Sequence, residues 1–265
     1  MESQMDLREI TRGTLRPFMP SIRVAIVFHS GYGHTQRQAE AVKTGVEQVE
    51  GAEALLLTVE EAQQRWDNLA SADAIIFGTP TYVAGVSAAF KAFEEASSHA
   101  VMTKGLGWKD KIAAGFTNSG SRSGDKLATL MQIALFAAQH GMHWVNLGLR
   151  PGNHSTKGSE EELNRLGFWL GAGAQSNTDQ GPDLAPPEAD LATARHLGRR
   201  VAKATLQFVR GRAADVLAPG ISAGVEPARA IDSAYLSNEA GSKRSKGSSR
   251  STATLRSSRS NRSGN

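Results

Sequence analysis

The sequence predicts an α/β fold in which a five-stranded parallel sheet lies between two layers of helices. Two observations indicate this fold. Short apolar runs of the kind that form buried parallel strands recur five times along the chain. Stretches with helical spacing of apolar residues separate these runs. The expected strands are residues 22–28, 53–58, 73–78, 111–117 and 143–148.

The helices between these strands are predicted from their periodicity and their ends. Ala39, Val42 and Val46 recur near helical spacing directly after the first strand and its loop. A second helix, 87–97, begins at Ser87, a residue type that caps helix N-termini. A last helix, 190–210, is expected to begin at Asp190 and to end at Gly211.

The most regular amphipathic pattern covers residues 125–140, where Gly141 follows as a C-terminal cap. Apolar residues stand there at positions i, i+3, i+4, i+7, i+8 and i+11. They are Leu127, Leu130, Met131, Ala134, Leu135 and Ala138.

Composition divides the chain into three parts: an N-terminal extension (1–20), one domain (21–212), and a basic Ser/Arg-rich tail (213–265). From Asn238 onward, seven Lys and Arg residues oppose one Glu, so this segment carries +6 and residues 1–237 carry −2. The tail has too few apolar residues to offset the entropy of ordering, and we expect it to be disordered. A solvated tail is the favoured interpretation, and contact with nucleic acid is the weaker one.

Several classes of protein are disfavoured by what the sequence lacks. It has no cysteine, which excludes disulfides, thiolate nucleophiles and Cys-ligated metal centres. No apolar run approaches the roughly 18 residues of a membrane span. The first 20 residues contain acids and no apolar core, unlike a secretory signal. We therefore expect a cytoplasmic location, and we assign no metal site.

Polar loops follow three of the predicted strands. They are residues 30–35 after the first strand, 78–85 after the third and 117–124 after the fourth. In an open parallel sheet, ligands bind beyond the carboxyl ends of the strands, so these loops are expected to emerge at one edge.

The first of these loops, Ser30-Gly31-Tyr32-Gly33-His34-Thr35, has the composition of a phosphate site. It lacks the lysine of a P-loop and the third glycine of a dinucleotide-binding motif. What remains is a nest of hydroxyl groups and backbone amides at a helix N-terminus, which suits a terminal phosphate monoester. An ordinary strand-to-helix turn is the alternative, and two further polar loops on the same edge make it less attractive.

These loops together resemble a known family. The Ser-x-Tyr-Gly-His-Thr, Gly-Thr-Pro-Thr-Tyr and Asn-Ser-Gly-Ser segments, followed by a helix ending in Gln-His-Gly-Met, are similar to flavodoxin-like FMN proteins. The nearest likeness is to NAD(P)H-dependent FMN reductases and NAD(P)H:quinone oxidoreductases of the tryptophan-repressor-binding-protein type, over residues 22–210. The resemblance implies a flavodoxin-like α/β/α sandwich with strand order 2-1-3-4-5, and FMN as cofactor with NAD(P)H as co-substrate.

The resemblance also implies which residues bind FMN. The phosphate is expected at the first loop, the isoalloxazine ring at the second and third loops, and a ring-side group at the end of the 125–140 helix. The full set is Ser30, Gly31, Tyr32, Gly33, His34, Thr35, Pro80, Thr81, Tyr82, Val83, Thr117, Asn118, Ser119, Gly120, Ser121, Arg122, Gln139 and His140. Tyr82 stands where many relatives have Arg, and Gln139-His140 where some have a His pair, so acceptor and nicotinamide preference are left open.

The third loop favours an enzyme over an electron carrier. Carrier flavodoxins usually cover both faces of the flavin with aromatics, whereas here only the second loop supplies one, Tyr82. The open face would accept NAD(P)H and then a quinone-like acceptor in a ping-pong reaction. Catalytic proton transfer is assigned to Tyr32, His140 or solvent. The alternative for His140 is a structural histidine at a helix end, and the alternative function is a flavodoxin without substrate turnover.

Residues 149–189 form a long segment that we expect to be irregular and to lie over the flavin edge or against a neighbouring subunit. Trp169 and Trp108 are candidates for the acceptor pocket, with simple packing as the alternative. The resemblance further implies a homodimer or homotetramer whose subunits share walls of the active site.

Overall fold

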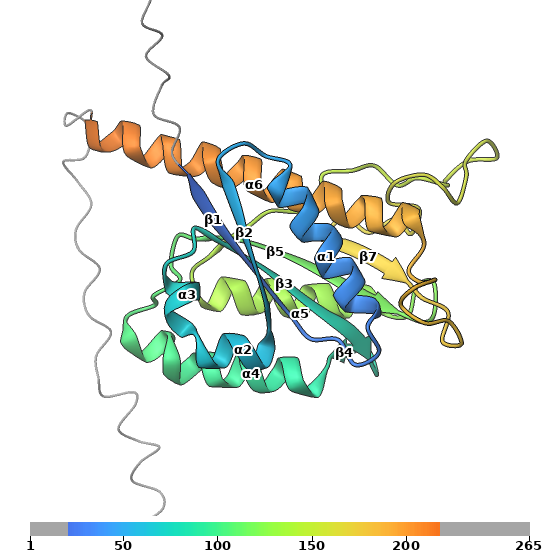
Figure 1. Ribbon diagram of the computed structural model, residues 1–265, viewed down its shortest axis with the longest axis horizontal. Helices are drawn as coiled ribbons and strands as arrows, with labels where there is room; N and C mark the ends of the chain where they lie inside the picture. The colour runs from blue at the N-terminus through green and yellow to red at the C-terminus, as the bar shows by residue number, and fades with distance from the viewer. Residues whose placement is uncertain (1–20, 218–265) are drawn as a thin grey trace, which may run out of the picture. The chain divides into compact units, whose positions relative to one another are not determined.

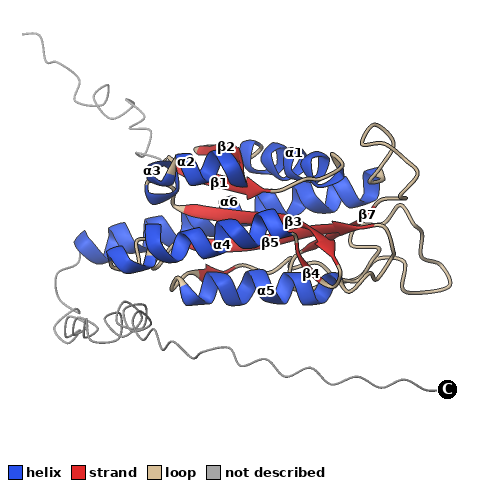
Figure 2. Ribbon diagram, turned by 90° about the horizontal axis from the view of Figure 1, so that it is seen from below, coloured by secondary structure: helices blue, strands red, loops and turns tan. Residues whose placement is uncertain are grey.

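A computed structural model describes residues 21–217 and shows a parallel sheet between two helical layers (Figures 1 and 2). The predicted extension, 1–20, and residues 218–265 of the predicted tail lie outside the described residues. The sheet runs in the order β2-β1-β3-β5-β6. Its strands are β1 (Ile22–Phe28), β2 (Ala52–Thr58), β3 (Ala74–Tyr82), β5 (Ile112–Ser119) and β6 (His143–Trp144), and all of these pairings are parallel.

The flavodoxin-like fold class is confirmed, but the fifth strand differs from the prediction. Residues 143–148 were expected as one strand, whereas β6 contains two residues and β7 (Ala172–Gln175) pairs with the later half of β5. The fifth position of the sheet is therefore filled by two short strands, and residues 145–171 are inserted between them. The expectation that 149–189 is wholly irregular is wrong for the same reason.

The polar segment after the third predicted strand is also more regular than expected. Strand β3 continues to Tyr82 and turns through Val83 and Ala84 into β4 (Gly85–Val86), which pairs antiparallel with it. The second loop of the candidate site is thus the tip of a hairpin, held on the sheet itself.

Two helices, α1 (His34–Glu47) and α6 (Glu188–Leu217), cover one face of the sheet, where Figure 1 shows them side by side. Both helices use glycine to approach closely. A side chain at Gly45 would lie 1.9 Å from the carbonyl oxygen of Arg195, and one at Gly198 would lie 2.0 Å from that of Val42. Helix α6 passes through Gly211, so the predicted end at that residue is wrong, and residues 213–217 belong to this helix rather than to the tail.

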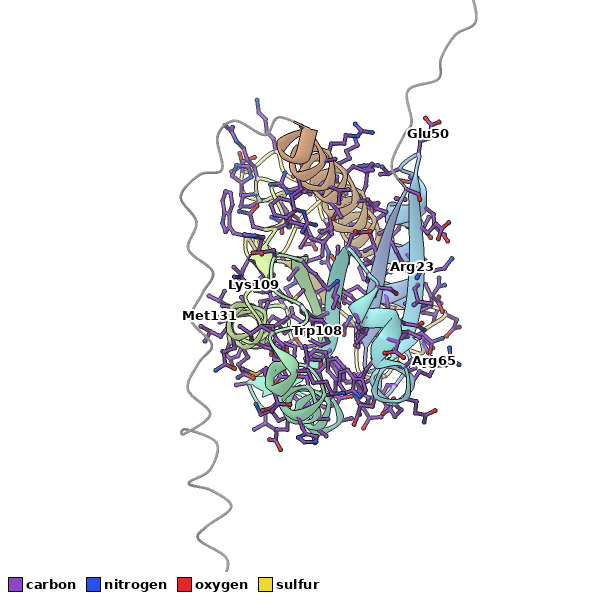
Figure 3. The ribbon with its side chains drawn as sticks, turned by 90° about the vertical axis from the view of Figure 1, so that its left-hand side faces the viewer. Arg23, Glu50, Arg65, Trp108, Lys109 and Met131 are labelled. Carbon is purple, nitrogen blue, oxygen red and sulfur yellow. The ribbon has the colours of Figure 1, made fainter. Side chains whose placement is uncertain are left out.

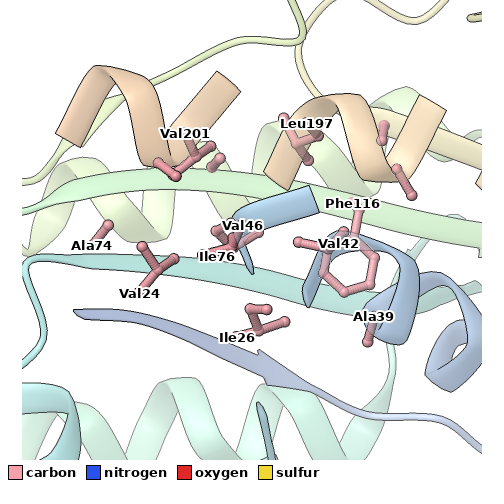
Figure 4. Packing of buried hydrophobic residues seen from close by; sticks show 14 of the residues in the cluster. Val24, Ile26, Ala39, Val42, Val46, Ala74, Ile76, Phe116, Leu197 and Val201 are labelled. Carbon is pink, nitrogen blue, oxygen red and sulfur yellow. The ribbon is translucent and has the colours of Figure 1, made fainter. Parts of the chain in front are cut away.

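The core beneath α1 and α6 is mainly aliphatic, with Phe28 and Phe116 among its buried residues. Alternate residues of β1 point into it because side chains along a strand alternate between faces. Figure 4 shows Val24 and Ile26 packing toward Val42 and Val46 of α1, with Leu197 and Val201 of α6 beside them.

The opposite face carries α2 (Val59–Gln64), α3 (Trp66–Ala70), α4 (Ala88–Ala100) and α5 (Lys126–Gln139), with a short 3₁₀ turn, Met102–Lys104, after α4 (Figure 2). Its core contains a group of aromatic rings among aliphatic side chains. Phe77 of β3 is surrounded by Phe90, Phe93, Trp108 and Phe136, with ring centroids between 5.3 and 6.4 Å away.

Helix α5 presents a different face to the core than its periodicity suggested. The buried residues are Lys126, Thr129, Leu130, Ile133, Phe136 and Ala137. Of the six apolar positions predicted for the stripe, Leu127, Met131 and Leu135 are 52%, 50% and 64% exposed. Figure 3 shows Met131 on the outside of the molecule and Trp108 toward the interior. The helix is apolar around most of its circumference, so the pattern alone could not identify the buried side.

Candidate functional site

A hollow of about 580 Å³ lies where the carboxyl ends of β1, β3 and β5 meet. This is the edge at which open parallel sheets bind ligands. The three predicted loops line it together with a fourth segment. The lining residues are Ser30, Gly31, Tyr32, His34, Thr35, Pro80, Thr81, Tyr82, Asn118, Ser119, Gly120, Ser176, Thr178, Gln180 and Gly181.

The first loop leaves hydrogen-bond donors free at the N-terminus of α1. Gly33 is the N-cap residue with φ 85°, and the helix has no side-chain cap. Within the described chain, the backbone amides of residues 31–35 have no acceptor, and the Oγ1 of Thr35 makes no hydrogen bond although that residue is only 2% exposed. The amide of Gln36 donates to the Oγ of Ser30 at 3.1 Å. Free amides at the positive end of a helix dipole favour an anion.

The second loop places Tyr82 against the first loop. A side chain at Gly31 would meet the hydroxyl of Tyr82 at 2.5 Å, so only glycine permits this approach. The rings of Tyr32 and Tyr82 meet edge-on with centroids 6.4 Å apart. Partial burial, with a smaller contribution from Tyr32, raises the pKa of Tyr82, which keeps its hydroxyl protonated at neutral pH.

The third loop rests on a buried network of hydroxyl groups. Thr117 donates to the carbonyl oxygen of Thr79 at 2.6 Å, and Thr81 donates to Thr129 of α5 at 2.8 Å. The hydroxyls of Thr81 and Thr117 are 2.9 Å apart. These bonds join β3, β5 and α5 directly below the hollow and fix the second and third loops relative to each other.

A fourth wall comes from the segment that follows β7. It belongs to residues 149–189, which were expected over the flavin edge or against a neighbouring subunit, although no residue of 175–181 was named as a site residue. Ser176, Thr178, Gln180 and Gly181 line the hollow. The Nδ2 of Asn118 donates to the Oγ of Ser176 at 2.8 Å, and the Nε2 of His34 donates to the carbonyl oxygen of Gln180 at 2.8 Å. The polar composition of 175–181 was the available signal, but only the pairing of β7 with β5 brings the segment here.

A second hollow of about 480 Å³ continues the first along the third loop. The two share Thr81, Ser119, Gly120 and Thr178, and the second also reaches Ser121, Gly124, Asn177 and Asp179. The combined space has an anion-binding end at the first loop and a wall of small polar residues at the other. It is thus shaped for an elongated ligand with a phosphate at one end.

Two predicted site residues, Gln139 and His140, are not brought to this hollow. They end helix α5, which begins at the third loop and runs back toward the amino ends of the strands. His140 is buried, its Nε2 is 3.1 Å from the Oγ of Ser97, and its ring lies 4.7 Å from that of Trp108. Burial lowers its pKa, opposed by a hydrogen bond to the carbonyl oxygen of Phe136. Within this chain, the contacts of His140 are those of a buried histidine at a helix end, away from the hollow, and its catalytic role stays a prediction.

Other predicted residues lie around the hollow without lining it. Gly33 caps α1 behind it, Thr117 lies beneath its floor, and Val83 is fully exposed at the hairpin tip. Arg122 points away to form an ion pair with Glu160 at 2.6 Å. Ser121 lines only the second hollow.

The two tryptophans proposed for an acceptor pocket are also elsewhere. Trp108 belongs to the aromatic core. Trp169 is exposed and lines a separate, more open hollow of about 690 Å³ with Arg122 and Leu127. That hollow is larger than the loop hollow, and of the three predicted loops it touches only Arg122 and Ser123 of the third.

No helix in the described part of the chain is both long and apolar enough to cross a bilayer.

Comparison with known proteins agrees with this geometry. The NADPH-dependent FMN reductase family matches residues 57–150. A protein named flavodoxin FldP from Pseudomonas aeruginosa is 40% identical over 68% of this chain and 95% of its own length. An NAD(P)H dehydrogenase (quinone) from Syntrophobacter fumaroxidans is 31% identical over 71% of this chain and 100% of its own. A crystal structure described as a flavodoxin, WrbA-like protein from Agrobacterium tumefaciens is 40% identical, with a TM-score of 0.55, and the match covers 71% of this chain and 99% of that one.

This chain belongs to the flavodoxin-like NAD(P)H:quinone oxidoreductase family. It is therefore an FMN-dependent oxidoreductase with NAD(P)H as co-substrate. The donors present fit FMN, because free amides and a free Thr35 hydroxyl at the start of α1 suit its phosphate. The small residues of the third loop suit the hydrogen-bonding edge of its ring.

Proposed function

We propose that this oxidoreductase passes hydride equivalents from NAD(P)H through FMN to a quinone-like acceptor in a ping-pong reaction. One observation carries the proposal: a helix N-terminus with free donors and a wall of small polar residues share one hollow at the carboxyl edge of the sheet. When bound, FMN supplies the redox chemistry by accepting electrons in pairs from the nicotinamide and releasing them to the acceptor.

The first loop binds the phosphate of FMN in this proposal. The hydroxyls of Ser30 and Thr35 and the amides around Tyr32–Thr35 donate to its oxygens. The hydrogen bond from His34 to Gln180 fastens this loop to the fourth wall. A cation is not required, because several neutral donors and a helix dipole converge on one point.

The second and third loops hold the flavin ring. Tyr82 packs on one side, and Asn118, Ser119 and Gly120 face the polar edge of the ring. The third loop contributes no aromatic side chain, so the opposite face remains open to the nicotinamide and then to the acceptor. Holding two reactants in turn on one face supplies the proximity that a two-electron transfer needs.

Protons for the acceptor come from solvent or from Tyr32, a residue that is 76% exposed and lines the hollow. The variant Tyr32→Phe removes the hydroxyl and keeps the ring. A fall in kcat with acceptor, at an unchanged rate of FMN reduction by NAD(P)H, would assign the proton to Tyr32. Unchanged kinetics in both half-reactions would assign it to solvent.

Anaerobic titration tests the function as a whole. The FMN-loaded protein is mixed with NADH or NADPH while flavin absorbance is followed, and a benzoquinone is then added. We expect bleaching within seconds by at least one nicotinamide and recovery on addition of the quinone. A flavin that binds but is not bleached by either nicotinamide would contradict the proposal.

A second candidate is an electron-carrying flavodoxin without substrate turnover. The 40% identity to a protein named flavodoxin favours it. The same titration separates the two, because a carrier would be reduced only through a partner protein. The third loop argues for the enzyme, since it leaves one face of the ring uncovered.

We also propose that the protein forms a homodimer or homotetramer. Leu127, Met131 and Leu135 form an exposed apolar stripe along the outside of α5. Successive turns of a helix place such residues on one face, and a contiguous apolar patch of this kind marks an interaction surface. A second copy of this chain is the proposed occupant.

A further inference from the structure

Lys126, the first residue of α5, is a lysine with no exposed surface. Its ammonium group lies beneath the third loop and donates to the Oγ of Ser119 and to the carbonyl oxygen of Ser121, both at 2.7 Å. The ring of Phe168 closes the other side, with its centroid 5.8 Å from the Nζ. A fully buried lysine is rare in proteins unless a partner compensates its charge.

No carboxylate forms an ion pair with Lys126 within residues 21–217. The charge of Asp190 acts on Lys126, but Arg165 binds both oxygens of Asp190 at 2.9 Å, and one of these oxygens also accepts a hydrogen bond from the amide of Gln175. Burial lowers the pKa of Lys126 to about 8; Asp190 opposes this shift and Arg165 adds to it. The positive charge is therefore incompletely compensated in the protein alone.

The loop above Lys126 has a backbone that needs support. Gly124 and Asp125 adopt φ 52° and 54° in succession, and a side chain at Gly124 would lie 2.2 Å from the Oγ of Ser119. Glycine adopts this conformation freely, whereas it costs Asp125 on the order of 1 kcal/mol. The two hydrogen bonds from Lys126, with the bond from Ser119 Oγ to the carbonyl oxygen of Ser121 at 3.0 Å, tie the loop to the first turn of α5.

Ser119 connects this buried cation to the site. It lines both hollows, and its Oγ accepts the hydrogen bond from Lys126. A charge held behind a wall of small residues acts across that wall, because the interior screens it less than water would.

We propose that Lys126 is a positioning residue for FMN, which braces the third loop from below and presents a positive charge to the wall that Ser119 lines. This inference rests on the proposed binding of the flavin ring along the third loop. The ligand then compensates the positive charge of Lys126, which the protein alone compensates incompletely. This compensation is strongest when the flavin is reduced and carries more negative charge. By placing a charge near the polar edge of a flavin, a protein can change the reduction potential of that flavin.

The variant Lys126→Met removes the charge and both hydrogen bonds. We expect affinity for oxidised FMN to fall about tenfold, and affinity for the reduced cofactor to fall at least tenfold further. The second difference corresponds to a drop of about 30 mV in the two-electron midpoint potential of the bound flavin. In the ligand-free protein, amides of residues 119–124 should exchange with solvent at least tenfold faster.

Two further variants separate the bracing from the charge. Lys126→Gln keeps a hydrogen-bond donor but removes the charge. In this variant the amides of residues 119–124 should still exchange slowly, while the midpoint potential of the bound flavin should be lowered as in Lys126→Met. Lys126→Arg keeps the charge and should restore the potential. Lys111→Met is the matched control, because Lys111 is also a partly buried lysine that donates to backbone carbonyls, those of Ala70 and Ala72, remote from the site.

A midpoint potential of the Gln variant equal to that of wild type would overturn the electrostatic role. Loop exchange in the Met variant equal to that of Lys111→Met would overturn the bracing role. If Lys126→Met fails to fold, the Gln and Arg variants still decide the electrostatic role. Failure of the wild-type protein to bind FMN at all would instead refute the proposed function, while the exchange experiment on the ligand-free protein would still test the brace.

Discussion

Thr35 shows how one side chain can be reserved for a ligand. It is buried at the start of α1, yet its hydroxyl has no partner in the described chain. The residue lines the hollow, so solvent reaches the hydroxyl in the ligand-free protein, and a phosphate oxygen would replace water as its acceptor. The neighbouring backbone amides are also without an acceptor in the described chain, and no substitution of a side chain can remove them.

The substitution Thr35→Val should weaken FMN binding by about ten- to a hundredfold, because a hydrogen bond to a charged group contributes about 1.5–3 kcal/mol. Stability toward urea should not fall, since the hydroxyl makes no bond within the fold. Fluorescence titration of FMN measures the first and denaturation the second. The control is Thr44→Val on the same helix, whose hydroxyl donates to the carbonyl oxygen of Glu40; equal losses of affinity in the two variants would refute a phosphate contact at Thr35.

Lys126 should also leave a signature in the pH dependence of stability. Its pKa is about 8 in the folded protein against 10.5 for the free side chain. Between these values the unfolded chain binds more protons, so stability rises with pH across this window. Relative to Lys126→Met, wild type should gain about 2 kcal/mol between pH 8 and pH 10. Urea denaturation of the ligand-free proteins at both values measures the difference, and a flat or falling difference would show that the lysine is not desolvated.

At the scale of elements, the β3–β4 hairpin carries backbone strain beside the site. Its two-residue turn, Val83-Ala84, has φ 49° and 61°. Both central residues of a type I′ turn need positive φ, which favours Asn-Gly and disfavours a β-branched residue. Strain of this kind is often found at functional sites, and here it directs the strand that carries Tyr82.

Replacing Val83-Ala84 with Asn-Gly should therefore stabilise the protein, by about 1–2 kcal/mol. The side chain of Val83 is fully exposed, so its loss removes no core packing. Thermal or urea denaturation of the ligand-free protein gives the value. A destabilised double variant would mean that the turn is not of this type in solution.

The spacing of apolar residues predicted most helices and strands, because the residues within each of these segments favour that structure. The range of β1 was predicted without error, because five successive apolar residues followed by a glycine-containing loop are typical of a short strand buried on both faces. The buried side of α5 was not predicted correctly, because α5 has apolar residues around most of its circumference. The split of the fifth strand and the fourth wall at Ser176 depend on pairing between β5 and β7, which are far apart in sequence. The first loop was recognisable because its free donors follow from a local strand–loop–helix order.

At the scale of the whole molecule, the two faces of the sheet differ in whether the helices that cover them expose apolar residues on their outer side. The face under α1 and α6 is closed, with both helices packed on the aliphatic core. The other face carries α5, whose inner side packs on the sheet while its outer side exposes apolar residues. Since the third loop leads into α5 through Lys126, the proposed subunit interface and the FMN site share one helix.

The oligomer can be tested on that helix. Leu135→Lys places a charge at the C-terminal end of the exposed stripe and should shift the protein toward monomer in sedimentation velocity, with little change in monomer stability because Leu135 is 64% exposed. Leu184→Lys is the matched control, a leucine that is 66% exposed outside α5. Burying the introduced lysine costs free energy only at a position that a second copy of the chain covers. The two variants should therefore differ in their association and not in the stability of the monomer. If wild type sediments as a monomer at high concentration, or if both variants retain the same oligomer, the outer face of α5 is not the contact between subunits.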